Sequence, residues 1–102
     1  MGYILSSLFP PTAEFTTEPK RRNGRLPFTL TFDGSASTDP DGGGIAEYRW
    51  DFGDGSPLVI GPAAVVTYTY TQKGTFRVFL HVVDDDGTAS EKAATRQVIV
   101  RR

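Results

Sequence analysis

One stretch decides the fold of this chain, Tyr48-Arg49-Trp50-Asp51-Phe52-Gly53-Asp54-Gly55-Ser56. Its aromatic residues alternate with charged ones, which is the period-two pattern of a β-strand with one buried face. Residues 53–56 then end the strand, because Asp-Gly pairs tolerate the positive φ that tight turns require. The pattern therefore predicts that the chain's only tryptophan lies at the end of a strand, directly before a rigid turn.

The same alternation recurs along the chain and predicts short strands throughout. The predicted strands cover residues 12–17, 26–33, 45–52, 65–71, 75–83 and 95–101. Residues 18–25 are predicted to be a loop, and residues 56–62 a loop or weak edge segment that two prolines interrupt. Glycine and proline recur too often for a helical pattern. Six or seven strands at this spacing predict an all-β fold, an antiparallel β-sandwich of two sheets.

Composition narrows the class of protein. A chain of 102 residues is long enough for one domain. We assign residues 12–102 to this domain. Residues 1–11 are assigned to an N-terminal linker or to residues left by cloning. A net charge of -1 gives no reason to expect a nucleic-acid partner. The absence of cysteine excludes disulfides and zinc-thiolate sites. The longest apolar run, residues 63–66, is too short to insert into a membrane, and a signal peptide, if the parent protein is exported, is expected upstream.

Five blocks of the sequence, in order and at the family's spacing, resemble the PKD domain, the immunoglobulin-like module named after polycystic kidney disease. They are residues 32–42, 48–55, 66–70, 74–76 and 82–87, and the most specific is the Trp-Asp-Phe-Gly-Asp-Gly segment at 50–55. One difference lies before Tyr70, where the family often has a histidine; Tyr70 itself keeps the inward aromatic side chain. The resemblance implies an immunoglobulin-like sandwich of about seven strands.

The resemblance also implies a function. Such modules are generally non-catalytic domains of secreted or cell-surface proteins, acting as spacers or as surfaces for protein or carbohydrate contact, and the fold does not choose between these roles. The expected partners are neighbouring domains of the parent protein, other surface proteins or a polysaccharide, and the isolated domain is expected to be a monomer. Two alternatives stay open: a calcium-binding module in which the metal stabilises the domain and its linker, and a carbohydrate-binding accessory domain of a secreted hydrolase.

Calcium is the sharpest site hypothesis. Asp39 and Asp41 lie between the second and third predicted strands, and residues 84–86 form an aspartate run in the last hairpin. A sandwich brings these two loops to the same end, and Ca²⁺ takes 6–8 oxygen ligands. The PKD-like modules of some collagenases bind calcium between these loops, and by position the matching carboxylates are Asp39, Asp41 and Asp84. The alternative is that these aspartates are turn formers that bond to backbone amides.

The residues of the opening stretch are expected to be structural. Asp51 and Asp54 resemble a catalytic carboxylate pair, but their place in a turn favours hydrogen bonds from turn amides. His81 is the only histidine and is predicted to face outward, and no constellation meets the geometry of an active site, so we predict no enzyme. Outward apolar positions could form a contact surface: Ile45, Phe79 and Val83. The residues assigned to the structural motif are Trp50, Asp51, Phe52, Gly53, Asp54, Gly55 and Tyr70.

Overall fold

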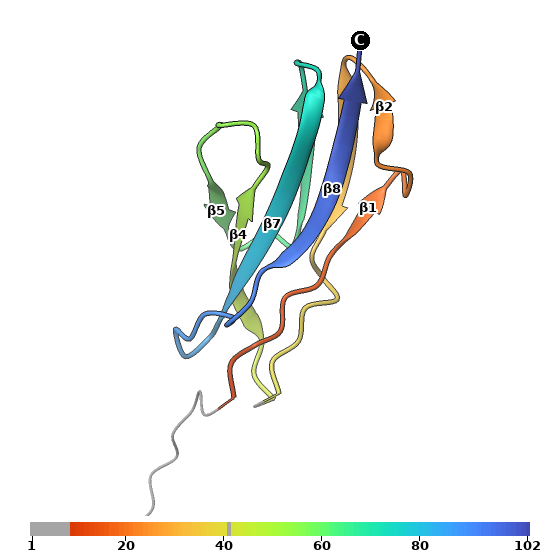
Figure 1. The fold of residues 1–102 in the computed structure, drawn as a ribbon. Helices are drawn as coiled ribbons and strands as arrows, with labels where there is room; N and C mark the ends of the chain where they lie inside the picture. The colour runs from red at the N-terminus through yellow and green to blue at the C-terminus, as the bar shows by residue number, and fades with distance from the viewer. Residues whose placement is uncertain (1–8, 41) are drawn as a thin grey trace, which may run out of the picture.

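The computed structural model describes residues 9–40 and 42–102, and within these ranges it contains eight strands and no helix (Figure 1). No helix in this part of the chain is therefore long and apolar enough to cross a membrane. The three-stranded sheet has the order β1-β3-β6, with β1 Thr16–Glu18, β3 Phe28–Asp33 and β6 Val65–Tyr70. The five-stranded sheet has the order β2-β8-β7-β4-β5, with β2 Asn23–Arg25, β4 Ile45–Asp51, β5 Val59–Gly61, β7 Gly74–Asp84 and β8 Ala94–Arg101. The predicted two-sheet all-β sandwich is confirmed.

One strand lies inside a segment that was predicted to be a loop. β2 pairs parallel with β8, with Asn23 opposite Ile99, so one pair in this sandwich is not antiparallel. The backbone N–H of Ile99 donates to the carbonyl of Arg22 at 2.8 Å. The polar segment Asn-Gly-Arg has no apolar alternation. β2 forms because the backbone edge of β8 is available for pairing. The spacing of apolar residues in a sequence does not reveal such an edge.

Trp50 fills the centre of the core between the two sheets. Its side chain is buried, and its ring centroid lies 5.2 Å from that of Phe15 and 5.7 Å from that of Phe32. Phe52 follows on the same face of the chain, with its ring 6.1 Å away. Aromatic pairs at these separations add to the stabilisation from burial alone. The predicted position of the tryptophan is confirmed.

The turn after β4 is held by the two aspartates of the opening stretch. Asp51 Oδ1 accepts a hydrogen bond from the Gly53 N–H at 2.9 Å, and Asp54 Oδ1 accepts one from the Ser56 N–H at 3.1 Å. The hydroxyl of Tyr70 donates to the carbonyl of Phe52 at 2.8 Å, which ties the three-stranded sheet to this turn. The carboxylates therefore act on the turn amides, as expected of turn formers.

The described chain begins and ends at opposite ends of the sandwich (Figure 1). The end where the chain enters also carries the β3–β4 loop and the β7–β8 loop, while the C-terminus lies at the other end. Thr12 and Thr38 exchange two backbone hydrogen bonds of 2.8 and 3.0 Å, which fix the entering segment to the β3–β4 loop. Most of the predicted linker, residues 1–8, lies outside the described residues.

Candidate metal site

Asp84 is the last residue of β7, and its side chain is 1% exposed. Its Oδ1 atom accepts hydrogen bonds from the Asp86 N–H at 3.0 Å and from the Thr88 N–H at 2.9 Å. These two bonds shape the turn between β7 and β8. Asp84 is therefore a turn former through one of its two carboxylate oxygens.

The other oxygen of Asp84 is in a different situation. Asp84 Oδ2 is buried and accepts no hydrogen bond from any described residue. A buried acceptor that lacks a partner destabilises a protein by about 1–3 kcal/mol, and by more when it is charged. A cation or a hydrogen-bond donor beside Asp84 Oδ2 would therefore remove this destabilisation.

Two further carboxylates converge close to Gly43 in the β3–β4 loop. A Cβ atom on Gly43 would lie 2.6 Å from Asp85 Oδ1 and 2.9 Å from Asp39 Oδ2. The backbone N–H of Asp85 donates to the carbonyl of Gly44 at 3.2 Å, which joins the two loops. Any side chain at position 43 would collide with these carboxylates, so the glycine keeps open the space in which they meet.

The β7–β8 turn gathers its own carboxylates. Single carboxylate oxygens of Asp84, Asp85 and Asp86 lie within 4.8 Å of one another, with Asp85 and Asp86 exposed. Asp39 is not part of this cluster; its Oδ2 lies close to Asp85 in the space at Gly43, and the metal-ligand roles of Asp39 and Asp84 stay predictions. Asp41 lies outside the described residues, so its part in the site stays a prediction.

Asp85 was not among the carboxylates matched from the sequence, whereas the structure places its Oδ1 beside Gly43. The signal that could have identified it is the run of three glycines at 42–44, because consecutive glycines allow a backbone to approach other groups closely. The donor set consists of carboxylate oxygens, with backbone carbonyls nearby. Oxygen donors of this kind suit a hard cation such as Ca²⁺, which tolerates irregular geometry. The residues present therefore fit a calcium ion.

Asp54 has a perturbed pKa with a structural cause. Burial by itself would raise the pKa of Asp54, but hydrogen bonds from Ser56 and Tyr68 outweigh it and lower this pKa below the usual 3.8. Burial and the neighbouring Asp54 carboxylate raise the pKa of Tyr68. Asp54 is thus stabilised as a charged acceptor, which suits a fastening role and is unsuited to a proton donor near neutral pH.

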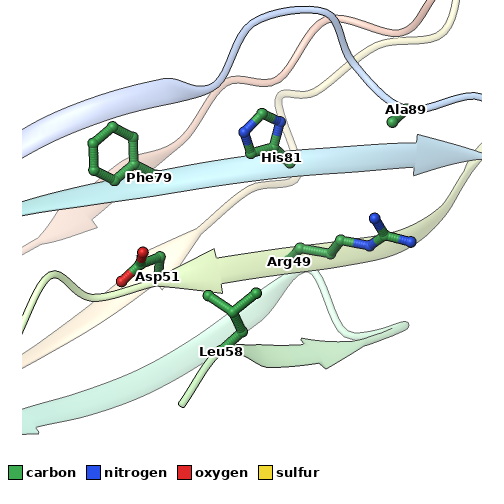
Figure 2. A pocket seen from close by; sticks show the side chains of 6 residues that line it. All are labelled: Arg49, Asp51, Leu58, Phe79, His81 and Ala89. Carbon is green, nitrogen blue, oxygen red and sulfur yellow. The ribbon is translucent and has the colours of Figure 1, made fainter. Parts of the chain in front are cut away.

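A separate hollow of about 510 Å³ lies on the outer face of the five-stranded sheet (Figure 2). Phe79 and His81 of β7 and Arg49 and Asp51 of β4 line it, together with Leu58 and Ala89. It contains a histidine and an aspartate, but no serine, threonine or lysine lines it. Among the described residues, this hollow therefore does not assemble a catalytic triad.

The predicted outward apolar surface is largely wrong. A β-bulge between Ile45 and Glu47 shifts the register of β4, so Ile45 packs against the core. Val83 pairs with Ala89 in an isolated bridge and is 8% exposed, because the chain after the β7–β8 turn covers it. Of the three predicted positions, only Phe79 lines an open surface.

Comparison with known proteins identifies the family. A family model described as PKD domain matches residues 9–100. The chain belongs to the PKD domain family. A solved PKD1 domain from the Vibrio cholerae metalloprotease PrtV is 28% identical to this PKD domain, with a TM-score of 0.69 over 92% of this chain and 100% of that chain. The resemblance inferred from the sequence blocks is confirmed.

Two further relatives place the domain in larger proteins. A microbial collagenase from Vibrio alginolyticus is 34% identical over 88% of this PKD domain, which spans only 10% of the collagenase. A solved structure from work on the promiscuous specificity of carbohydrate-binding modules of the β-sandwich superfamily has 34% identity and a TM-score of 0.79. It matches 91% of this chain, which covers 35% of that one. The PKD domain thus recurs as a part of longer chains.

Proposed function

We propose that this PKD domain is a non-catalytic spacer module of a larger extracellular protein, and that a calcium ion fixes the end at which the chain enters. Two observations support the spacer role: the described chain enters and leaves at opposite ends, and the domain spans a small part of its relatives. A module with this geometry holds its neighbours apart. Those neighbouring domains are its first partners, and contact with other surface proteins or a polysaccharide is a further role that suits such a spacer.

One observation carries the calcium proposal. Asp84 Oδ2 is a buried carboxylate oxygen without a hydrogen-bond donor among the described residues, and it lies in the turn that also positions Asp85. Asp85 in turn meets Asp39 at Gly43. A divalent cation would satisfy the buried oxygen and offset the mutual repulsion of the carboxylates. We assign Asp39, Asp84 and Asp85 as ligands, with Asp41 as a further candidate.

The position of this site connects the metal to the linker. Thr38 directly precedes Asp39 and is hydrogen-bonded through its backbone to Thr12, at the start of the domain. An ion that holds Asp39 therefore also restrains the segment that enters the domain. The calcium-loaded module would be a stiffer spacer than the calcium-free one.

Thermal unfolding with and without calcium tests this proposal. At a calcium concentration tenfold above Kd, binding to the folded state adds about 1.4 kcal/mol, which raises Tm by roughly 5–10 °C for a domain of this size. Asp84→Asn keeps an oxygen for the turn amides but removes the charge, so we expect a folded variant whose Tm does not respond to calcium. Asp39→Ala and Asp85→Asn should each reduce the calcium response.

The matched control for these variants is Glu91→Gln, because Glu91 is an exposed acid of the same connection and lies outside the cluster. This control should keep the full calcium response. A wild-type melting curve that is identical in calcium and in chelator would refute the calcium proposal. An equal loss of response in Glu91→Gln would show a general charge effect in place of a site.

A further inference from the structure

The hollow on the outer face of the five-stranded sheet has an ordered arrangement of side chains. Asp51 of β4 lies opposite Phe79 of β7, and Arg49 lies opposite His81 in the next outward pair. Leu58, in the segment before β5, forms one wall and is 52% exposed (Figure 2). An aromatic ring and an aliphatic side chain thus border the same space as three polar side chains.

Two of the three polar side chains of the hollow are held by bonds at its margin. Asp51 uses Oδ1 to accept from the Gly53 N–H, and Arg49 uses Nε to pair with Glu47. Asp51 Oδ2 and the two Nη groups of Arg49 make no hydrogen bond to another described residue, and His81 is exposed. The hollow therefore offers an acceptor on Asp51 and donors on Arg49 and His81, and contacts at its margin restrain Asp51 and Arg49.

The charges of the hollow exclude several classes of ligand. Arg49 and Asp51 carry opposite charges in neighbouring positions of one strand, so the lining has no net charge to attract an anion or a cation. The polar groups are unsuited to a lipid chain. A neutral ligand that combines apolar C–H surface with hydroxyl groups, which both donate and accept, matches this lining.

We propose that this hollow binds a sugar unit of a neutral glycan. The ring of Phe79 and the side chain of Leu58 contact the C–H face of the sugar. Asp51 accepts hydrogen bonds from its hydroxyl groups, and Arg49 and His81 donate to them. This site shares no residue with the calcium cluster, so glycan binding is expected in chelator as well as in calcium, and it does not depend on the proposed metal site.

The test is a titration of the ¹⁵N-labelled chain, followed by amide chemical shifts. The probes are cellohexaose, xylohexaose, mannohexaose and N-acetylchitohexaose, with a heparin hexasaccharide as the anionic comparison and a collagen-like peptide as the protein comparison. At least one neutral oligosaccharide should give saturable shifts at Arg49, Phe79 and His81. The heparin fragment and the peptide should not shift these amides.

Variants in the hollow separate a site from a general surface effect. Phe79→Ala should weaken binding at least tenfold, and Leu58→Ala about threefold, because each removes apolar contact with the sugar. Ile60→Ala is the matched control: Ile60 is 54% exposed on β5 and does not line the hollow. It should leave the affinity unchanged. Leu58→Ala removes an exposed side chain, so it tests the proposal even where Phe79→Ala impairs folding.

Three results would overturn the proposal. The first is the absence of saturable shifts with all four neutral oligosaccharides. The second is a set of shifts that maps outside β4 and β7. The third is stronger binding of the heparin fragment or the collagen-like peptide, detected at the same amides. That result would show that the hollow prefers an anionic or a protein ligand to a neutral glycan.

Discussion

At the scale of single residues, the two carboxylate oxygens of Asp84 have different surroundings. Oδ1 accepts two turn amides, as a structural aspartate does, and Oδ2 is buried without a donor among the described residues. The two interpretations of the aspartate run, as turn formers and as metal ligands, are therefore compatible within one side chain. The sequence left both interpretations open. One oxygen can bond to the turn amides while the other stays available to a cation.

Two glycines of the opening stretch give a matched prediction about strain. Gly53 and Gly55 have φ values of 81° and 85°, but a Cβ on Gly53 would lie 2.3 Å from the carbonyl oxygen of Arg77, whereas one on Gly55 meets nothing within 4 Å. Gly55→Ala should cost about 1–2 kcal/mol for its left-handed backbone alone. Gly53→Ala should cost at least about 3 kcal/mol, because β7 or the turn must also move.

Urea denaturation of both variants measures this difference. The free energy of unfolding should fall in the order wild type, Gly55→Ala, Gly53→Ala. Equal losses for the two variants would mean that the close approach to Arg77 does not constrain the turn.

At the scale of elements, Asp54 joins the turn after β4 to the opposite sheet. It accepts from Ser56 and from the hydroxyl of Tyr68, which belongs to β6 of the three-stranded sheet. Together with the bond from Tyr70 to Phe52, this contact fixes the turn to both layers. The most specific sequence block of the family is thus the part of the chain at which the two sheets are fastened together.

Because Asp54 holds the turn through its charged carboxylate, the stability of the domain is predicted to depend on pH. The pKa of Asp54 is lowered in the folded state, so its contribution to stability is present above the unfolded value of 3.8 and is lost as pH falls through the folded pKa. Asp54→Asn should be less stable than wild type at pH 7, and this difference should narrow below about pH 4. In a Tyr68→Phe background the difference should be smaller at every pH. A difference that stays constant from pH 7 to pH 2 would contradict this role.

Much of the element structure was predictable, because it follows from side-chain alternation. The alternation around Trp50 predicted β4, its buried face and the turn after it. It did not predict the direction of Ile45, because a β-bulge inserts one residue and reverses the alternation beyond it. It also did not predict β2, because that strand forms on the backbone edge of β8 and has no apolar pattern of its own.

The sequence predicted which two loops form the candidate metal site, but not how their carboxylate oxygens are arranged. Sandwich topology placed Asp39 near the β7–β8 turn, which the structure bears out through Asp85 and Gly43. The approach of Asp85 to Asp39, and the different surroundings of the two oxygens of Asp84, depend on the conformation of two turns. Such conformations arise from backbone hydrogen bonds between loops, which residue spacing does not encode.

At the scale of the whole molecule, the features separate along the sandwich. The loops at the entry end (Figure 1) carry the carboxylates and the contact between Thr12 and Thr38. The interior holds the aromatic core, and the outer face of the five-stranded sheet carries the hollow (Figure 2). With the proposed calcium ion at one end and the proposed glycan site along its side, the spacer would orient neighbouring domains on a glycan. The proposed metal site and the proposed glycan site share no residue.

A crystal structure of the chain grown in millimolar calcium tests whether a calcium ion binds at the entry end. We predict a cation within about 2.3–2.6 Å of Asp84 Oδ2, with carboxylate oxygens of Asp39 and Asp85 in the same coordination sphere. A structure in which a water molecule or a protein N–H donates a hydrogen bond to Asp84 Oδ2, and no cation lies between the two loops, would contradict the proposed calcium site.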